Sequence, residues 1–294
     1  DYIQANGNVT LRSGGAIDDL DAVVNGLDVL SGGTLDIQSA GNTVDLDTQV
    51  AKLTESITGG TTIREADGVE IAGMDTNAGG FVDVSTTDGN ILVSGAVDAG
   101  AAGNGGTITL NAGGTGRDIT VGAAGSLISN GALVNLDATG SIAFSGSVNA
   151  GAGDVQMSAV AGGIFQSAGA LTADEVQALA GGAVTLDGAA NDLNAVAVRA
   201  GSTVAIRDID GLAVGSVNGT DGIATTDDPV GITTGGNLTL TKAVNAGSGN
   251  VTIDATGSVI GSGLVTAAVL DVGATNGIDI ATAAATVDAD TEAA

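Results

Sequence analysis

The side chains in this sequence that could do acid–base chemistry are almost all carboxylates. Three groups of aspartates are closely spaced: Asp18 with Asp19 and Asp21, Asp208 with Asp210, and Asp227 with Asp228. Acid–base cleavage of a glycosidic bond needs two carboxylates at a fixed separation in a cleft, usually one lined by aromatic residues that stack on sugar rings. The 294 residues include three phenylalanines, one tyrosine and no tryptophan. We therefore predict that these carboxylates are not catalytic.

Other kinds of catalysis lack the residues they need. The chain contains no histidine and no cysteine, which excludes a Ser-His-Asp triad, a thiol nucleophile, a disulfide framework and an ordinary zinc site. Polysaccharide lyases would need clustered basic side chains. The seven basic residues are instead scattered along the chain: Arg12, Lys52, Arg64, Arg117, Arg199, Arg207 and Lys242. The sequence predicts a protein that is not an enzyme, and a polysaccharide-active enzyme is the last of three functional interpretations.

Calcium binding is the functional interpretation that suits the acids, because aspartates and backbone carbonyls in turns supply hard oxygen ligands. The pattern Arg-acid-x-Asp-Gly occurs at 64–68 and again at 207–211. Its acids Asp67, Asp208 and Asp210 are the candidate ligands. The alternative interpretation is a turn with an Asp-Gly corner and a local pair between the arginine and a carboxylate. We expect no cofactor other than such a calcium ion.

Charge and hydropathy exclude two classes of partner. The 34 acidic and 7 basic side chains give a formal net charge of −27, which opposes binding to nucleic acids and to anionic membrane surfaces. No apolar run approaches 18 residues, so we predict no insertion into a membrane. The glycine-rich stretch 99–106 lacks the lysine and the helix that follow a phosphate-binding loop. We interpret this stretch as a surface loop.

Short segments of alternating apolar and polar residues recur along the whole chain and predict β-strands. Units of strand and turn follow one another mostly about 20 to 26 residues apart, the range of solenoid repeats. Val50, Leu53 and Ile57 have helical spacing, but the equivalent residues of a second copy read as a strand, so we predict a strand here too. The alternating segments are 8–11, 33–37, 80–84, 107–110, 133–136, 154–157, 184–186, 196–198, 238–240 and 251–253.

Longer similarities show that the units are related by duplication. Residues 62–71 match 205–214, and residues 89–100 match 236–247. The offset between the copies grows from about 143 to 147 residues along these matches. We therefore predict an insertion in the second copy, near 227–229.

Stacking of such units predicts an all-β fold, a parallel β-helix (solenoid) of about twelve coils. Each strand would pair with its equivalent one coil along, with Val, Leu and Ile inward and Thr, Asn, Asp and Ser outward. Glycine and asparagine would occupy the corners, where positive φ is needed. We expect residues 1–294 to form one continuous β-helix segment and to be a piece of a longer repeat protein.

Several phrases resemble the repeats of large bacterial filamentous haemagglutinin-like adhesins, including those of the autotransporter type. They are Gly-Gly-Asn-Leu-Thr-Leu-Thr at 235–241, Val-Asn-Ala-Gly-Ser-Gly-Asn-Val-Thr-Ile at 244–253 and Ala-Asp-Gly-Val-Glu-Ile-Ala-Gly at 66–73. The resemblance covers nearly the whole chain and is one of repeat style. It implies a right-handed parallel β-helix rod on the bacterial cell surface or outside the cell.

From this resemblance we expect a non-enzymatic rod segment of a secreted surface adhesin, acting in cell adhesion, biofilm formation or surface attachment. The alternative is a structural subunit of an extracellular filament or sheath, with calcium as a stabilising ion. The expected partners are an unidentified receptor or glycan on a host or neighbouring cell, and further copies of the chain joined end to end or laterally.

Overall fold

The computed structural model describes residues 2–19, 26–39, 43–77, 79–101 and 104–291. Two compact units are distinguished, unit 1 from Asp1 to Asp154 and unit 2 from Val155 to Ala294. Each unit is described by itself. Asp21, one of the clustered aspartates, lies outside the described residues.

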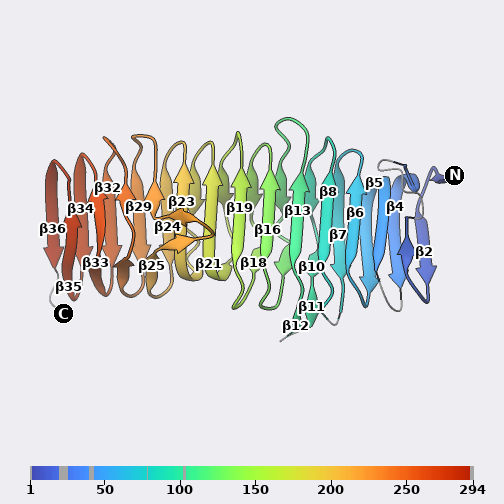
Figure 1. Ribbon diagram of the computed structural model, residues 1–294, viewed down its shortest axis with the longest axis horizontal. Helices are drawn as coiled ribbons and strands as arrows, with labels where there is room; N and C mark the ends of the chain where they lie inside the picture. Colours follow the sequence, from blue (N-terminus) through green and yellow to red (C-terminus); the bar gives the residue numbers. More distant parts are fainter. Residues whose placement is uncertain (1, 20–25, 40–42, 78, 102–103, 292–294) are drawn as a thin grey trace. The chain divides into compact units, whose positions relative to one another are not determined.

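Both units are built from turns of a parallel β-solenoid, about twelve turns in the described residues. The described residues contain strands and no helix, and thus no helix that could cross a membrane. Within each unit, successive turns lie side by side in Figure 1, and each main strand pairs in parallel with a strand of the next turn. These observations confirm the predicted all-β parallel solenoid.

The strands of unit 1 form parallel ladders, joined by one small antiparallel hairpin. The strands are β1 (Ile3–Ala5), β2 (Val9–Ser13), β3 (Ile17–Asp18), β4 (Val29–Ser39), β5 (Val44–Ile57), β6 (Thr61–Glu65), β7 (Val69–Asp75), β8 (Val82–Thr86), β9 (Ile91–Val93), β10 (Ala96–Asp98), β11 (Gly100–Ala101), β12 (Asn104–Gly105), β13 (Ile108–Ala112), β14 (Ile119–Val121), β15 (Ser126–Ile128), β16 (Val134–Ala138), β17 (Ile142–Phe144) and β18 (Ser147–Asn149).

Unit 2 repeats this plan and also carries one antiparallel hairpin. Its strands are β19 (Val155–Ala159), β20 (Ile164–Gln166), β21 (Leu171–Ala180), β22 (Val184–Leu186), β23 (Asp192–Ala200), β24 (Val204–Asp208), β25 (Leu212–Val214), β26 (Ser216–Val217), β27 (Thr220–Asp221), β28 (Ile223–Ala224), β29 (Val230–Thr234), β30 (Leu238–Leu240), β31 (Val244–Asn245), β32 (Val251–Ala255), β33 (Ser258–Thr266), β34 (Val269–Ala274), β35 (Gly277–Thr282) and β36 (Thr286–Thr291).

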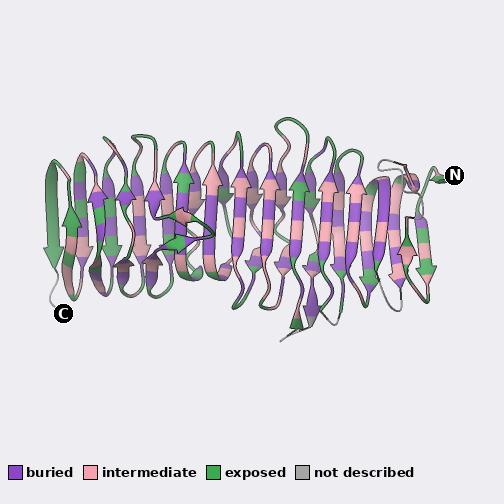
Figure 2. Cartoon of the chain, in the orientation of Figure 1, coloured by how far each residue is buried: buried purple, intermediate pink, exposed green. Residues whose placement is uncertain are grey.

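Buried and more exposed residues alternate along the strands, as the bands of colour in Figure 2 show, and the buried ones form the core. In β4, β5, β7 and β9 the in-register residues Leu35, Leu53, Ile71 and Val93 point inward and are 0% exposed. Full burial of one such side chain stabilises the fold by roughly 1.5–3 kcal/mol. Because the same position is apolar in turn after turn, this gain recurs along the ladder.

Residues 50–57 form a strand, as the duplication predicted. They belong to β5, which pairs with β4 on one side and with β6 and β7 on the other. Pairing on both edges with neighbouring turns outweighs the helical spacing of the three apolar residues.

The predicted insertion lies elsewhere than expected. In unit 1, β7 continues without interruption from Val69 to Asp75. In the second copy the hairpin β26–β27 separates the corresponding strands β25 and β28. The extra residues therefore lie at 216–221, and the placement near 227–229 was wrong. That turn instead uses positive φ at Asp227 (60°).

The glycine-rich stretch 99–106 also differs from the expected plain loop. Gly100–Ala101 pairs with Asn104–Gly105 in a short antiparallel hairpin, and residues 102–103 lie outside the described residues. At the equivalent corner of the next turn, Asn130 and Gly131 have φ of 55° and 103°. This agrees with the predicted use of asparagine and glycine at corners.

Close contact between turns makes a specific prediction at Gly106. A Cβ there would lie 1.6 Å from the carbonyl oxygen of Gly80 in the preceding turn. We expect Gly106→Ala to force the turns apart and to lower the free energy of unfolding by about 1–3 kcal/mol. Urea titration would measure the change. Gly14→Ala is the control, because nothing lies within 4 Å of a Cβ at Gly14. Equal stability of the two variants would contradict the prediction.

Candidate functional site

The duplicated Arg-acid-x-Asp-Gly motif occupies the same kind of corner in both units. In unit 1, Arg64 and Glu65 end β6, and the turn that follows leads into β7. In unit 2, Arg207 and Asp208 end β24, and the turn leads into β25. The inward row of each strand thus finishes on a carboxylate, at the point where the chain leaves one face of the solenoid.

Glu65 is buried and accepts two hydrogen bonds from β5. Its Oε1 accepts the backbone N–H of Val50 at 2.9 Å, and its Oε2 accepts the hydroxyl of Thr48 at 2.7 Å. The side chain of Glu65 is 1% exposed. Burial raises the pKa of Glu65 from 4.5 to about 7, and the two hydrogen bonds oppose this shift.

Asp208 makes the equivalent contact in unit 2. Its Oδ1 accepts the backbone N–H of Leu193 at 2.8 Å, and its Oδ2 accepts the N–H of Asp210 at 3.1 Å. Burial raises the pKa of Asp208 above its usual 3.8, and the two backbone hydrogen bonds lower it.

The two corners share one function within the fold. In each, the acid accepts a backbone N–H 15 residues earlier in the chain, in the preceding turn. A buried N–H without a partner costs roughly 1–3 kcal/mol. With one oxygen, the duplicated acid therefore satisfies a backbone donor that would otherwise be buried without an acceptor. Its second oxygen accepts another hydrogen bond, from Thr48 or from the N–H of Asp210.

The other predicted calcium ligands lie on the surface. Asp67 is exposed and accepts the amide of Gln49 at 3.1 Å. Asp210 is exposed and lies in the turn after Asp208. Neither the three candidates nor any other described residues form a group of three or more acids that could hold a metal ion. The structure brings Asp208 and Asp210 together, whereas Asp67 belongs to the equivalent turn of unit 1.

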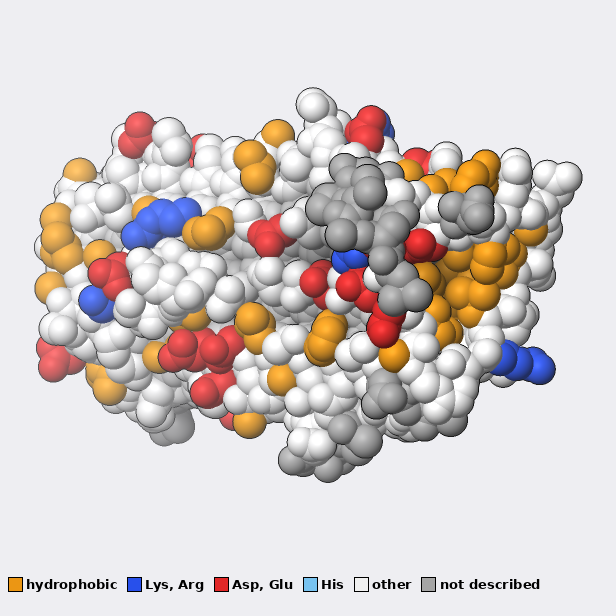
Figure 3. All heavy atoms as spheres, turned by 45° about the vertical axis from the view of Figure 1, so that its right-hand side comes forward, with side chains coloured by type: hydrophobic (Ala, Val, Ile, Leu, Met, Phe, Trp, Pro, Cys, Tyr) orange, Lys and Arg blue, Asp and Glu red, His pale blue; other side chains and the backbone are white. Residues whose placement is uncertain are grey.

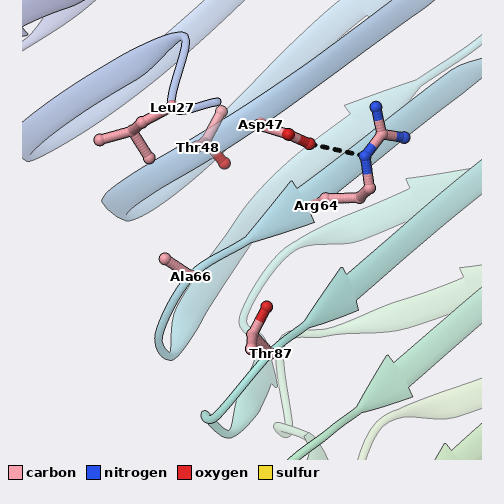
Figure 4. A pocket seen from close by; sticks show the side chains of 6 residues that line it. All are labelled: Leu27, Asp47, Thr48, Arg64, Ala66 and Thr87. Carbon is pink, nitrogen blue, oxygen red and sulfur yellow. Dashed lines mark hydrogen bonds and ion pairs between the residues drawn. The ribbon is translucent and has the colours of Figure 1, made fainter. Parts of the chain in front are cut away.

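Arg64 bridges two carboxylates of the turn before it. Its Nε donates to Oδ1 of Asp47 at 2.6 Å, and its Nη2 donates to Asp45. Asp83 lies one turn further on. Burial raises its pKa above the usual value, and the positive charge of Arg64 opposes part of this rise. Figure 4 shows the Arg64–Asp47 contact beside a hollow of about 70 Å³, which Thr48, Ala66 and Thr87 also line. The predicted local arginine–carboxylate pair is therefore a pair between turns.

Among the described residues, the second copy has no such ion pair at Arg207. The register of β22 with β24 aligns Thr185 with Ala205, where β5 and β6 align Asp45 with Thr62, and Arg207 is exposed. The buried acid is thus the feature that the two corners share, while the role of the arginine differs.

Acids and amides in other turns also connect neighbouring coils. In six corners a side-chain oxygen accepts a backbone N–H from the next turn at 2.7–3.0 Å. The acceptors and donors are Asn8 with Thr34, Asp28 with Asp47, Asn90 with Asp118, Asp118 with Ser141, Asp227 with Ser248 and Asn237 with Ser258. These bonds join turns in the same way as the strand ladders do.

The remaining aspartates do not assemble a paired acid–base site in the described residues. Asp18 ends β3 and is exposed, and the backbone N–H of Asp19 donates to the carbonyl of Asp45. Asp228 hydrogen-bonds through its backbone to Thr225. Asp19 thus contacts the next turn, and Asp228 contacts its own turn.

A groove of about 490 Å³ in unit 1 has three aspartates on its walls. Asp36 accepts hydrogen bonds from Gln38 and Thr54. Asp75 accepts the N–H of Asn77, and Asp98 accepts the amide of Asn130. All three carboxylates are thus acceptors within the solenoid.

Sequence reasoning overlooked Glu65 and Glu55, the two buried glutamates of unit 1. The alternation of the strand could have predicted the burial of Glu65, because every second residue of β6 points inward, namely Thr61, Ile63 and Glu65. Because Glu55 and Glu65 are acidic, they were expected to face solvent.

Comparison of the chain with protein-family models, curated proteins and solved structures gave no match.

The corner acids make a testable prediction. Glu65→Ala and Asp208→Ala should each lower the free energy of unfolding by about 1–3 kcal/mol, because Val50 N–H or Leu193 N–H loses its acceptor. Amide hydrogen exchange should accelerate at Val50 in the first variant and at Leu193 in the second. Asp67→Ala is the matched control and should change stability by no more than about 0.5 kcal/mol. A control effect as large as that of Glu65→Ala would refute the assignment.

Proposed function

We propose that this chain is a non-enzymatic rod segment of a large secreted bacterial adhesin, placed on the cell surface or outside the cell. The observation that carries the proposal is that polar side chains of the protein hydrogen-bond one turn to the next. Acids and amides that could have formed a site accept hydrogen bonds from neighbouring turns instead. Such a structure is suited to spanning a distance and to holding another domain away from the cell.

The charge of the surface supports the same proposal. Acidic side chains predominate over lysine and arginine on the face in Figure 3, in keeping with the net charge of −27. Like charge keeps extended molecules apart in solution. The receptor, in this proposal, is a surface or glycan on a host or neighbouring cell, bound by a part of the protein other than these turns.

Deletion of one complete turn tests the rod function directly. Ile108 pairs with Val82 in the preceding turn and with Val134 in the next. Removal of residues 108–133 therefore lets β16 pair with β8 in the same register. If the turns act as a spacer, this deletion within the full-length protein should leave folding and attachment to surfaces intact.

The matched control removes residues 108–120 and breaks the register, so it should abolish folding of unit 1. Circular dichroism would measure folding, and counting of cells attached to a coated surface would measure function. Loss of attachment in a correctly folded one-turn deletion would place a binding or catalytic site on that turn and overturn the proposal.

A filament or sheath subunit is the second candidate, favoured by the strand edges. In the described residues, β36 pairs only with β34, and all six of its residues are exposed. Apolar side chains gather over β1–β3, at the right of Figure 3, where Tyr2, Ile3, Leu11 and Ile17 line a groove of about 400 Å³. Open edges of this kind can pair with another chain. Fibres with a regular axial repeat in electron micrographs would support this candidate.

The filament interpretation includes calcium as a stabilising ion, and the role of calcium can be tested separately. If calcium joins acids of neighbouring turns, a chelator should lower the melting temperature and added calcium should restore it. Asp210→Asn should remove the response, whereas Asp18→Asn should retain it. An unchanged melting temperature in the presence of chelator would eliminate calcium as a stabilising ion.

A further inference from the structure

One buried acid of unit 1 occupies the inward apolar row, beneath the groove of about 490 Å³ described above. Glu55 of β5 is in register with Ile37 of β4 and with Met74 of β7. The same inward row continues to Val97 and begins at Leu11. Ile37, Met74 and Val97 are at most 1% exposed, and Glu55 is 6% exposed. A carboxyl group therefore stands where the neighbouring turns place aliphatic side chains.

The polar contacts of Glu55 are incomplete. Its Oε1 accepts a hydrogen bond from the hydroxyl of Thr61, which is itself fully buried. Its Oε2 is the one buried side-chain nitrogen or oxygen among the described residues that has no hydrogen-bond partner. Glu65, in contrast, uses both of its oxygens. An ionised carboxylate at Glu55 would thus be buried with a single hydrogen bond, which is strongly unfavourable.

The charged groups on the strands around Glu55 are engaged elsewhere. On β5 and β7, Lys52 pairs with Glu70 at 2.9 Å. On β6, Arg64 pairs with acids of β5. Asp36 of β4, Asp75 of β7 and Asp98 of β10 line the same groove as Glu55. They occupy positions of opposite parity to the inward row and accept hydrogen bonds there. The nearby cations therefore pair with acids other than Glu55.

We propose that Glu55 is a proton-dependent lock: its neutral form holds β5 stacked between β4 and β7, and its ionisation loosens this part of unit 1. The lock differs from the corner acids, because its ionised form gains no backbone N–H in exchange for burial. It is independent of the proposed function and applies to a rod or a filament alike.

The direction of the pH effect follows from the titration of Glu55. Burial raises the pKa of Glu55 from 4.5 to about 7, and the bond from Thr61 opposes the shift. The folded chain therefore keeps the proton at pH values where the unfolded chain has released it. The stabilisation is complete below pH 4.5 and is lost as the pH rises to about 7. Over this range the equilibrium constant for opening should increase on the order of 10²-fold.

Hydrogen exchange with mass spectrometry tests this proposal in the whole chain. Corrected for the intrinsic pH dependence of exchange, peptides from β4, β5 and β7 should open on the order of 10²-fold more at pH 8 than at pH 5. Glu65 also has a pKa of about 7 and bonds to β5, so the comparison is made in Glu65→Gln chains. There, Glu55→Gln should remove most of the difference, because the amide cannot ionise. Peptides from β33 and β34 of unit 2, which do not pair with the strand of Asp208, serve as an internal reference.

Glu70→Gln is the matched control variant. Its hydrogen bond from Ser94 and its pairing with Lys52 lower the pKa of Glu70, so its contribution is lost only as the pH falls below the ordinary range. This variant should keep the wild-type response between pH 5 and pH 8. A Glu65→Gln chain whose pH response is unchanged by adding Glu55→Gln would overturn the proposal.

Direct titration provides a second readout if Glu55→Gln fails to fold. The chain has only five glutamates, so carboxyl ¹³C labelling of glutamate gives few signals to follow by NMR. Two of them, those of Glu55 and Glu65, should titrate near pH 7 in the wild-type protein. Glu65→Gln identifies the signal of Glu65. The lock is disproved if the remaining high-pH signal is missing and every other glutamate titrates at 5 or below.

Discussion

Register between equivalent strands of successive turns is the constraint on which the rest of this structure depends. Each inner strand gives its backbone hydrogen bonds to the turns before and after it, so the paired side chains lie above one another, also in the three described ladders that contain a register shift. A position that is apolar in one turn must therefore be compatible with the same interior position in the next. Leu35, Leu53 and Ile71 satisfy this requirement with aliphatic side chains. Close contacts such as that of Gly106 with Gly80 follow from the same repeat.

Corners are where the ladder cannot satisfy the backbone, and there the polar residues acquire their roles. A chain that turns between two faces leaves N–H groups without a partner on the neighbouring strand. Asp118 and Asn237 accept such donors near the surface, while Glu65 and Asp208 accept them inside. The acidic composition is therefore in part a consequence of building many corners, in addition to its effect on charge.

The fold could be predicted from the sequence because the alternation of apolar and polar residues and the spacing of the repeats can be read from short segments. Val82, Asp83 and Val84 already alternate as they do in β8, and the duplication identified residues 50–57 as a strand. The corner acids could not be predicted in the same way. Glu65 has inward parity, but whether a carboxylate is tolerated inside depends on Val50 N–H, a partner 15 residues earlier in the chain. The place of the insertion was missed because the hairpin at 216–221 is held by Gln177, which is more than 40 residues away.

Two buried glutamates of one unit show how position decides what an acid does. Glu65 stands at the end of a strand, where the bending chain supplies two donors, so burial raises its pKa while hydrogen bonds limit the cost. Glu55 stands within a face, where it accepts one hydrogen bond, from Thr61, and its other oxygen has no partner. A solenoid can therefore accommodate acids at corners at little cost, whereas an acid within a face makes the stability of its turn depend on a proton.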